Sequence, residues 1–398
     1  MTKVFSSTGV TTGTYSDRLA VASPYLGQQF YQTDTDELLK YVTDLDTQNR
    51  WMQADHDYSR NLVVNGSFAI WQRGASFNPV SATTTTGLNY GADRWQMLQA
   101  TTNGATAAYT RTAITSTDPA GYNYYCRVQR TSAQTFTTAY TLQTSFESTN
   151  IQAVRGKYVT LSFWARAGAN YSAASGFLVS NIVTGTGTDN TAGNFTTNTV
   201  NTTANNVLTT SWKRFSITTS AAIATTITQL GISFVFTPVG TAGAADYYDI
   251  TGVQLETGTA PSDFEQRDVG DELRRCQRYY ERSDDSSRGT THTLRDSYWN
   301  ASDGCISSAK SGASFDCAVR FTVLKRVDTY SVSIYGSTLV NQIQIENIGI
   351  SNTTDVFSAT INKSVNGFFF RHTTANASYN TGSGNCQARF NYEAIAEL

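Results

Sequence analysis

The stretch Val-Thr-Leu-Ser-Phe-Trp-Ala-Arg at residues 159–166 decides the fold class, because apolar and polar side chains alternate along it. One set is Val159, Leu161, Phe163 and Ala165, and the other is Thr160, Ser162, Trp164 and Arg166. In an extended chain successive side chains point to opposite faces, so each set occupies one face. This period predicts a strand.

The same alternation returns at residues 230–236 and 388–394, and turn-rich polar stretches such as 81–89 and 184–206 lie between the strands. The chain also has 22 Tyr and 20 Phe, which fit the pleated surface of a sheet. Few long helical patterns separate the strands. We therefore predict a mostly β protein built of antiparallel β-sandwiches rather than βαβ units.

Charge and composition exclude several functions. The 398 residues carry 29 Lys and Arg against 31 Asp and Glu, a net charge of −2. No global positive field attracts a polyanion, so we expect no nucleic-acid partner. No apolar run approaches the roughly 20 residues of a membrane span, so we expect no membrane insertion. The five scattered cysteines lack metal-ligand spacing, so we expect reduced, mostly buried thiols.

Changes in character divide the chain into four segments. Residues 1–60 have no clear core, and we expect a partner surface to stabilise this segment. Residues 61–268 form the main β-domain, residues 269–285 a linker or oligomerisation helix, and residues 286–398 a second, C-terminal β-sandwich unit.

The stretch 28–45 has two interpretations. Its apolar positions from residue 38 onward follow the i, i+3, i+4, i+7 spacing of an amphipathic helix. Alternatively, residues 30–31 and 39–42 are two strands joined by a polar Thr-Asp turn. Periodicity alone leaves both interpretations open.

The predicted helix begins after Asp268, whose side chain can cap it. Asp271 and Glu272 precede several arginines, and this charge order complements the helix dipole. An apolar seam with 4-3-4 spacing is formed by Val269, Leu273, Cys276 and Tyr280. The helix either forms an oligomer on a symmetry axis or lies against its own β-domain, and less than two heptads do not decide between these.

Several motifs together resemble one family. They are residues 61–74 (Asn-Leu-Val-Val-Asn-Gly-Ser-Phe-Ala-Ile-Trp-Gln-Arg-Gly), 90–95 (Tyr-Gly-Ala-Asp-Arg-Trp), 159–166, 250–256 followed by Phe264-Glu265, 276–280 (Cys-Gln-Arg-Tyr-Tyr) and 392–398 (Tyr-Glu-Ala-Ile-Ala-Glu-Leu). They resemble bacteriophage fibre proteins that contain a carbohydrate-binding-module-like jelly roll. Residues 30–35 are similar to short hairpins in other phage structural proteins.

The resemblance implies a virion fibre that is assembled in the host cytoplasm and exposed on the particle surface, usually as a homotrimer. Residues 1–60 would bind other virion proteins, the jelly roll would span 61–268, and the C-terminal unit would be a distal tip facing a host-cell glycan. The alternative is a purely structural role, as a capsid-decorating or cement protein or a tail adaptor. Attachment to tail or head stays open.

A surface rich in hydroxyl and amide groups with exposed aromatic rings suits a neutral glycan. Sugar C–H faces stack on such rings, and polar side chains satisfy the sugar hydroxyls. The candidates are Trp164 and Arg166, on one strand face, and Tyr298 and Trp299, beside a turn-rich loop. For Trp164 the competing interpretation is a core residue, because Trp is highly buried on average.

Two further expectations concern a metal and a reaction. The resemblance implies a structural Ca²⁺ held near Asp249, although the first strand offers Asn65-Gly66-Ser67 rather than an acidic partner. No other cofactor is expected. The sequence has no Gly-x-Ser-x-Gly elbow, His-Glu-x-x-His motif, phosphate loop or parallel-β-helix repeat, so we expect no catalysis.

Overall fold

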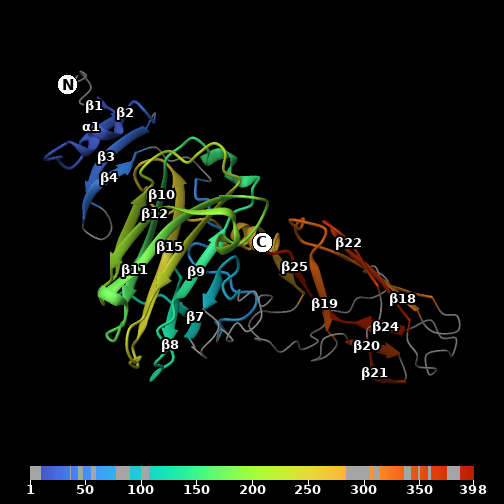
Figure 1. Cartoon of the computed structure of the whole chain (residues 1–398). Coiled ribbons are helices and arrows are strands. Elements are labelled where there is room, and N and C mark those ends of the chain that lie inside the picture. The colour runs from blue at the N-terminus through green and yellow to red at the C-terminus, as the bar shows by residue number, and fades with distance from the viewer. Residues whose placement is uncertain are drawn as a thin grey trace. The chain divides into compact units, whose positions relative to one another are not determined.

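The computed structural model describes residues 10–35, 37–43, 48–54, 60–77, 90–99, 107–283, 305–308, 314–335, 342–347, 350–356, 360–373 and 386–398. These residues form several antiparallel sheets with few helices, which confirms the mostly β sandwich class predicted from the sequence. The chain divides into two compact units (Figure 1). Unit 1 contains residues 1–69, 76–267 and 398, and unit 2 contains residues 70–75 and 268–397. Neither α-helix of the described chain is long and apolar enough to cross a bilayer.

Unit 1 begins with a small four-stranded sheet of order β1-β2-β3-β4. Its elements are β1 (Val10–Gly13), α1 (Tyr15–Leu19), β2 (Gln29–Gln32), β3 (Glu37–Thr43) and β4 (Asn49–Gln53). In its described residues, 28–35 and 37–43, the stretch 28–45 is therefore a hairpin and not a helix. Phe30 and Leu39 are both buried and lie directly opposite each other on the two strands. The hairpin therefore buries these apolar side chains together on one face of the sheet.

The main body of unit 1 is a sandwich of two sheets. The first has the order β13-β10-β15-β8-β7-β5, and the second has the order β12-β11-β14-β9-β6. The strands are β5 (Ser76–Phe77), β6 (Gln96–Gln99), β7 (Ala107–Ala113), β8 (Tyr124–Arg130), β9 (Tyr140–Ser145), β10 (Val159–Ala167), β11 (Phe177–Thr186), β12 (Thr196–Val207), β13 (Lys213–Thr218), β14 (Gln229–Phe236) and β15 (Tyr247–Thr257). Every pairing within the two sheets is antiparallel.

The core of the sandwich lies between these two sheets. Leu161 and Phe163 of β10 are fully buried, as the alternation predicted. The ring of Phe163 lies 4.7 Å from that of Phe234 in β14, in an edge-to-face arrangement. Trp95, also fully buried, lies 6.2 Å from Phe234 between ring centroids. Aromatic residues of both sheets therefore interlock in one core.

The other face of β10 is buried as well, which the alternation did not predict. The backbone at residues 258–263 crosses this face, and Thr160 donates a hydrogen bond of 2.8 Å to the carbonyl of Gly258. Arg214, on the neighbouring strand β13, donates to the Ser162 hydroxyl at 3.3 Å. A strand that is covered on both faces holds its polar residues in hydrogen bonds because burial without them is costly.

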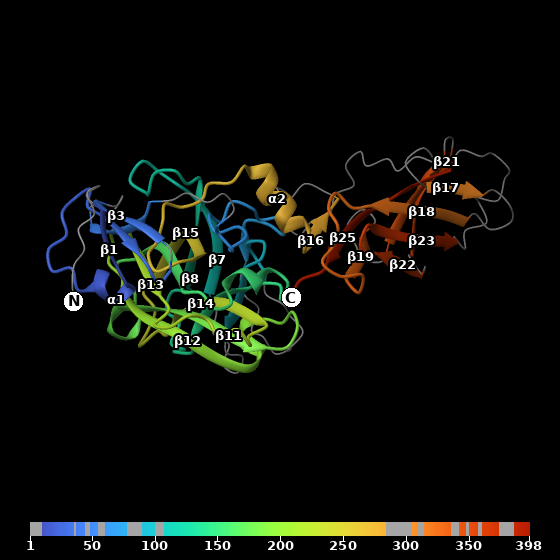
Figure 2. The same ribbon diagram turned by 90° about the horizontal axis from the view of Figure 1, so that it is seen from above.

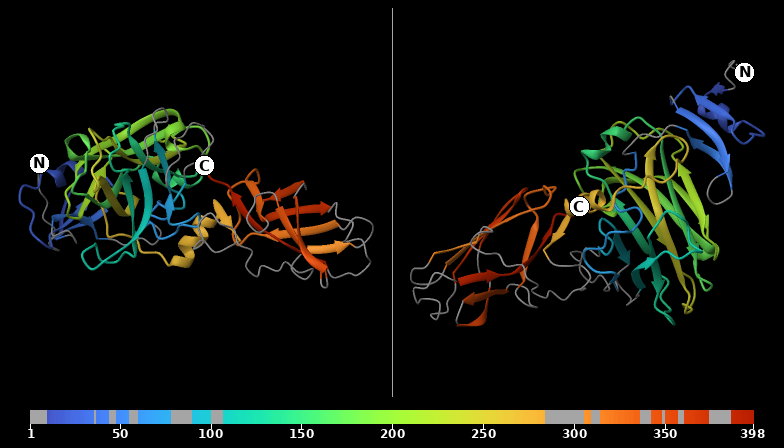
Figure 3. Two further views of the ribbon diagram at one scale, coloured as in Figure 1. Left: turned by 90° about the horizontal axis from the view of Figure 1, so that it is seen from below. Right: turned by 180° about the vertical axis from the view of Figure 1, so that it is seen from behind.

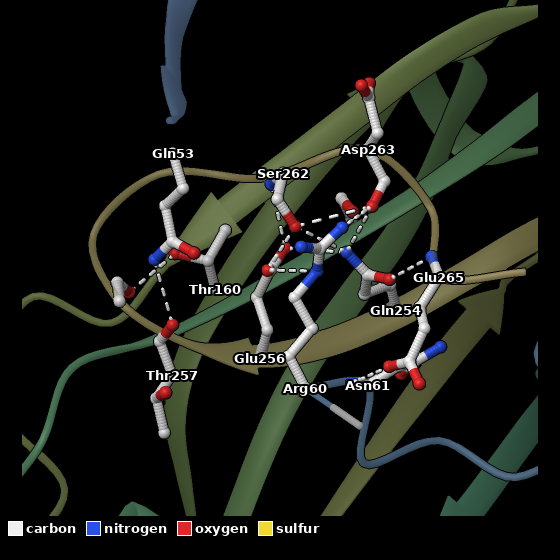
Figure 4. Close-up of polar contacts among 12 residues, drawn as sticks. Gln53, Arg60, Asn61, Thr160, Gln254, Glu256, Thr257, Ser262, Asp263 and Glu265 are labelled. Atoms are coloured by element: carbon white, nitrogen blue, oxygen red, sulfur yellow. Dashed lines mark hydrogen bonds and ion pairs between the residues drawn. The ribbon is translucent and has the colours of Figure 1, made fainter. Parts of the chain in front are cut away.

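The end of β15 is fixed by a buried carboxylate (Figure 4). Glu256 accepts hydrogen bonds from the Ser262 amide at 2.9 Å, from the Ser262 hydroxyl, and from the Gln254 amide at 2.9 Å. The Arg60 Nε lies 3.6 Å from it. Burial raises the pKa of Glu256 above its usual value, because these hydrogen bonds and the nearby charge offset the desolvation only in part.

The described residues of unit 2 form one helix and three small sheets, whose orange and red strands are visible in Figure 2 and Figure 3. The sheet orders are β16-β25-β19, β17-β18-β23-β22 and β21-β20-β24. The elements are α2 (Val269–Gln277), β16 (Tyr280–Arg282), β17 (Cys305–Ser308), β18 (Ser314–Arg320), β19 (Ser331–Tyr335), β20 (Gln342–Asn347), β21 (Ile350–Val356), β22 (Ile361–Ser364), β23 (Gly367–Thr373), β24 (Cys386–Arg389) and β25 (Asn391–Ile395).

The helix begins where the sequence predicts, with Asp268 accepting a hydrogen bond from the Gly270 amide at 2.8 Å. It ends at Gln277 and does not continue to residue 285, because the chain turns into β16 and pairs with β25. Glu281 of β16 is buried and accepts from Lys325 at 2.6 Å and from Tyr392 at 3.1 Å. These bonds to distant residues hold the segment as a strand.

The cysteines divide into two kinds. Cys126 and Cys276 are buried and form no disulfide, as predicted. Cys317 is disulfide-bonded, so the prediction of a reduced thiol is wrong for this residue. Cys305 and Cys386 belong to strands whose side chains lie outside the described part.

We predict that Phe234→Ala destabilises unit 1 by about 3–5 kcal/mol, because it removes a ring from a closely packed aromatic core. Urea unfolding followed by tryptophan fluorescence measures this, since Trp95 reports on the same core. The control is Val207→Ala, at an exposed position of β12, which should change stability by less than about 0.5 kcal/mol. Equal effects of the two changes would contradict this description of the core.

Candidate functional site

The sheet β17-β18-β23-β22 of unit 2 presents an aromatic ring on its open face. Phe368, Phe369 and Phe370 follow one another in β23, and their side chains alternate between the two faces. Phe368 and Phe370 are buried in the core of unit 2, whereas Phe369 is 38% exposed. Its neighbours across the strands are Ala318 and Asn362. A large aromatic ring therefore stands among small and polar residues.

A hollow of about 350 Å³ lies beside this ring. It is lined by Val319, Arg320, Asn362, Lys363, Ser364, Asn366, Gly367, Phe368 and Phe369. Gly367 makes the close approach of β18 and β23 possible, because a Cβ at this position would overlap the carbonyl oxygen of Val319. The volume is within the range of roughly 300–1,000 Å³ that small-molecule sites occupy.

The polar groups of the hollow are uncharged side chains and two cations, Arg320 and Lys363. Asn362, Ser364 and Asn366 supply amide and hydroxyl groups. Lys363 is held in place, because its ammonium donates to the carbonyl of Tyr330 at 2.7 Å. Among the described lining residues there is no carboxylate. The hollow therefore combines a ring for stacking with groups that can bond to hydroxyls, and it offers no acid–base pair.

Trp164 and Arg166 lie on the outer face of the six-stranded sheet, opposite the face that carries Leu161. Strand β15 bulges here, with Gly252 in a left-handed conformation at φ +61°, and the register between β10 and β15 shifts between Ser162 and Trp164. Trp164 is 5% exposed, so its ring has little surface on which a sugar could stack. This placement corresponds to the core interpretation of the residue.

Arg166 forms an ion-pair cluster with Asp249. The sequence analysis had assigned Arg166 to a glycan site and Asp249 to a Ca²⁺ site. The Arg166 Nε lies 2.8 Å from Asp249 Oδ2, and Arg127 binds both oxygens of Asp249, at 2.7 and 3.0 Å. A second Arg166 nitrogen lies 2.8 Å from Asp118. The cluster joins β8, β15 and β10 across the outer face of the sheet.

Aromatic rings surround this cluster. The Arg166 guanidinium lies 4.8 Å from the ring centroid of Trp212, and that of Arg127 lies 3.6 Å from Tyr247. Burial opposes the charge on both arginines, but their hydrogen bonds to Asp249 outweigh it and raise the pKa of each guanidinium. The arginines and aspartates of the cluster are therefore paired with one another, and their role is to stabilise the sheet.

The same cluster bears on the expected Ca²⁺ site. Both carboxylate oxygens of Asp249 accept hydrogen bonds from guanidiniums, and a Ca²⁺ ion needs six to eight oxygen ligands. Among the described residues, no group of three or more His, Cys, Asp or Glu side chains is placed to hold a metal. The residues around Asp249 therefore do not fit the ion.

The four residues of the predicted apolar seam differ in exposure, two being accessible to solvent and two buried in unit 2. Val269 is 56% exposed and Leu273 is half-buried, whereas Cys276 and Tyr280 are buried within their own unit. Tyr280 belongs to β16 and not to the helix. Only the first half of the seam is therefore accessible to a second chain. Tyr298 and Trp299 lie outside the described residues.

The sequence analysis did not assign Phe369 to the site. The sequence contains a pattern that predicts an exposed phenylalanine here. Asn366-Gly367 marks a hairpin turn, and the three consecutive phenylalanines of the following strand must alternate between its two faces. What the pattern does not give is which face of the strand is open. That depends on the sheets packed beneath Phe368 and Phe370.

No known protein family and no curated protein matches the sequence. Among solved structures, the enzymatically active domain of tailspike protein 4 of bacteriophage CBA120 is similar with 14% identity and a TM-score of 0.32, over 50% of this chain and 21% of that chain. A CBM4 structure is similar with 19% identity and a TM-score of 0.30, over 49% of this chain and 98% of that chain. TmCBM61, solved with β-1,4-galactotriose, is similar with 14% identity and a TM-score of 0.29, over 50% of this chain and 100% of that chain. This chain thus spans about a fifth of the tailspike's length, and the similarities concern the fold alone.

Asp249→Asn should lower the stability of unit 1 by about 1–3 kcal/mol, because two partly buried guanidiniums lose their shared anion. Thermal melting checks this, with Asp271→Asn at an exposed ion pair as a control that should melt like the wild type. Millimolar Ca²⁺ or EDTA should leave the wild-type melting temperature unchanged. If Ca²⁺ raised the melting temperature of the wild type but not that of Asp249→Asn, the conclusion that Asp249 does not bind Ca²⁺ would be wrong.

Proposed function

We propose that this protein is a non-catalytic structural protein of a phage virion that recognises a neutral host-surface glycan through the hollow beside Phe369. One observation carries the proposal: an exposed phenyl ring stands beside a hollow whose described lining offers amide and hydroxyl groups and no carboxylate. The C–H face of a sugar ring packs on the phenyl ring, and the amides bond to its hydroxyls.

The absence of reaction chemistry is part of the same proposal. Glycoside hydrolysis uses two carboxylates about 5–10 Å apart. The described lining of this hollow has none, and the outer-face carboxylates Asp118 and Asp249 are bonded to arginines. We therefore assign the hollow to binding and not to cleavage.

The fibre role extends the proposal to the whole chain. Residues 1–60 bind other virion proteins, and the C-terminal unit faces the host, as the resemblance of the sequence to phage fibre proteins suggests. A single shallow hollow binds weakly, so a homotrimer would multiply its avidity. The exposed Val269 and the half-buried Leu273 are the seam residues of α2 that are accessible for a trimer contact.

The second candidate is a capsid-decorating or cement protein or a tail adaptor. Hydrogen bonds join the N-terminal sheet to β15 and to the residues that follow β15. This attachment favours a mechanical, structural role in the particle. Particles that lack the protein distinguish the two functions. Loss of adsorption supports the fibre role, and loss of heat resistance with normal adsorption supports the structural role.

Phe369→Ala should weaken binding to neutral bacterial surface polysaccharides at least about tenfold, because aromatic contacts supply much of the affinity of such sites. A glycan array followed by calorimetry on the full chain measures the effect. Leu324→Ala is the matched control, since Leu324 is an exposed apolar residue of the same unit outside the hollow. Wild-type affinity in Phe369→Ala would remove the hollow from the proposal.

Val269→Asp should reduce the mass of the trimer to that of a monomer in light scattering, because three like charges would meet at the axis. Val239→Asp introduces the same charge at another exposed valine, in unit 1, and should leave the mass unchanged. A wild-type protein that is already monomeric, or a trimer that survives Val269→Asp, would contradict this contact.

A further inference from the structure

The open face of the sheet β17-β18-β23-β22 is arranged in rows, because residues directly opposite each other on neighbouring strands share a face. Strand β23 lies between β18 and β22 (Figure 2). Two successive rows across these three strands are Ala318, Phe369 and Asn362, and then Arg320, Gly367 and Ser364. Phe369 and Gly367 are therefore neighbours on the open face.

The second row has a gap at its centre, because Gly367 has no side chain. The gap lies between Arg320 on β18 and Ser364 on β22, beside the ring of Phe369. All four residues line the hollow of about 350 Å³. Neighbouring strands are roughly 4.8 Å apart, so the two flanking positions are separated by roughly 10 Å. A group of a few atoms therefore fits between them, against the ring.

The turn between β22 and β23, which borders this gap, is fixed by hydrogen bonds. The Phe321 amide donates to the Asn366 carbonyl at 2.9 Å, and the Lys325 amide donates to the Val365 carbonyl at 2.8 Å. Lys325 is itself anchored, because its buried ammonium donates to Glu281 at 2.6 Å. Both residues of the turn are therefore held before a ligand arrives, which lowers the entropy cost of binding.

The two sides of the gap offer opposite kinds of hydrogen-bonding group. The guanidinium of Arg320 is exposed and forms no hydrogen bond or ion pair with any described residue, so its N–H groups can donate to a ligand. The Ser364 hydroxyl already donates its hydrogen to the carbonyl of Gly367 at 3.3 Å, so its oxygen is left to accept. One side of the gap therefore donates and the other accepts.

The second cation of the hollow is engaged by the fold. Lys363 donates to the carbonyl of Tyr330 at 2.7 Å, and its ammonium lies 5.7 Å from the centroid of the Tyr330 ring. The described lining contains no carboxylate that would compete for Arg320 or repel a carbonyl oxygen beside it. The gap therefore suits a group that brings an acceptor to Arg320 and a donor to Ser364.

We propose that the hollow selects a neutral sugar that carries an acetamido group, an inference that rests on the function proposed for this hollow. In a trans amide the C=O and the N–H point in opposite directions. The carbonyl accepts from Arg320, the N–H donates to Ser364, and the methyl enters the gap at Gly367 against the ring of Phe369. A carboxylate has no hydrogen for Ser364, and a sugar hydroxyl has no methyl for the ring, so the acetamido group fits best.

Calorimetry of the full chain with two trisaccharides tests the proposal. Triacetylchitotriose and cellotriose are both neutral and share their sugar configuration and linkage, but only the first carries acetamido groups. The wild type should bind triacetylchitotriose at least about tenfold more tightly than cellotriose, because only this ligand makes the two additional hydrogen bonds. Its affinity should change little as NaCl is raised, because the ligand is uncharged.

Arg320→Ala should lower the affinity for triacetylchitotriose about tenfold and that for cellotriose by less than about twofold, because it removes the donor to the acetamido carbonyl. Arg275→Ala is the matched control, since Arg275 is an exposed arginine of the same unit outside the hollow. It should bind both trisaccharides like the wild type. Both variants should also melt like the wild type, because both side chains are exposed.

The outcomes separate this inference from the proposed function. Equal affinity for the two trisaccharides that Phe369→Ala abolishes would overturn the acetamido preference and leave the hollow as a site for neutral glycans. No binding of triacetylchitotriose, wild-type affinity for it in Arg320→Ala, or tighter binding of the acidic trigalacturonic acid would also overturn the preference. Wild-type binding of triacetylchitotriose in Phe369→Ala would overturn both the preference and the hollow as the binding site.

Discussion

Unit 1 depends on one strand, β15, and on the interactions that its two faces make. It is hydrogen-bonded to β10 on one side and to β8 on the other. Its inward residues Val253 and Leu255 are fully buried in the core, and its outward Asp249 joins arginines from both neighbouring strands. At its end, Glu256 and Thr257 hold the following loop and the N-terminal sheet. A single strand therefore links the hydrophobic core, the ion-pair cluster and the hairpin sheet.

Burial on both faces explains why the charged groups on the outer face of β8, β10 and β15 are bonded to one another. Charges taken out of water are stable only when they are paired and hydrogen-bonded. The outer-face arginines and aspartates meet this condition among themselves, so their role is structural. Among the described residues, the surface that we assign to a ligand is the open sheet face that carries the exposed ring of Phe369.

The sequence predicted what depends on local periodicity. The alternation at residues 159–166 identified a strand and its inward face correctly, and Asp268 marked the start of the helix. It left two interpretations for Trp164, a sugar-binding residue or a core residue, because the loop and the arginine that cover this side of β10 come from residues about 50 to 100 positions away. Nor did it show that Arg166 meets Asp249, because strand register between distant segments has no local signal. The helix ends before residue 285 because of contacts with residues distant in the sequence. Lys325 and Tyr392 donate hydrogen bonds to Glu281 and hold it in a strand.

We propose that the C-terminal unit functions through a ring exposed on an open sheet and without a reactive centre. Hydrogen–deuterium exchange of the whole protein, with and without a neutral polysaccharide purified from the host surface, tests it most directly. If the polysaccharide binds at Phe369, exchange should slow in the β22–β23 hairpin, residues 361–373, and the polysaccharide should be recovered uncleaved. Protection that leaves this hairpin unchanged, or a shortened polysaccharide, would contradict it.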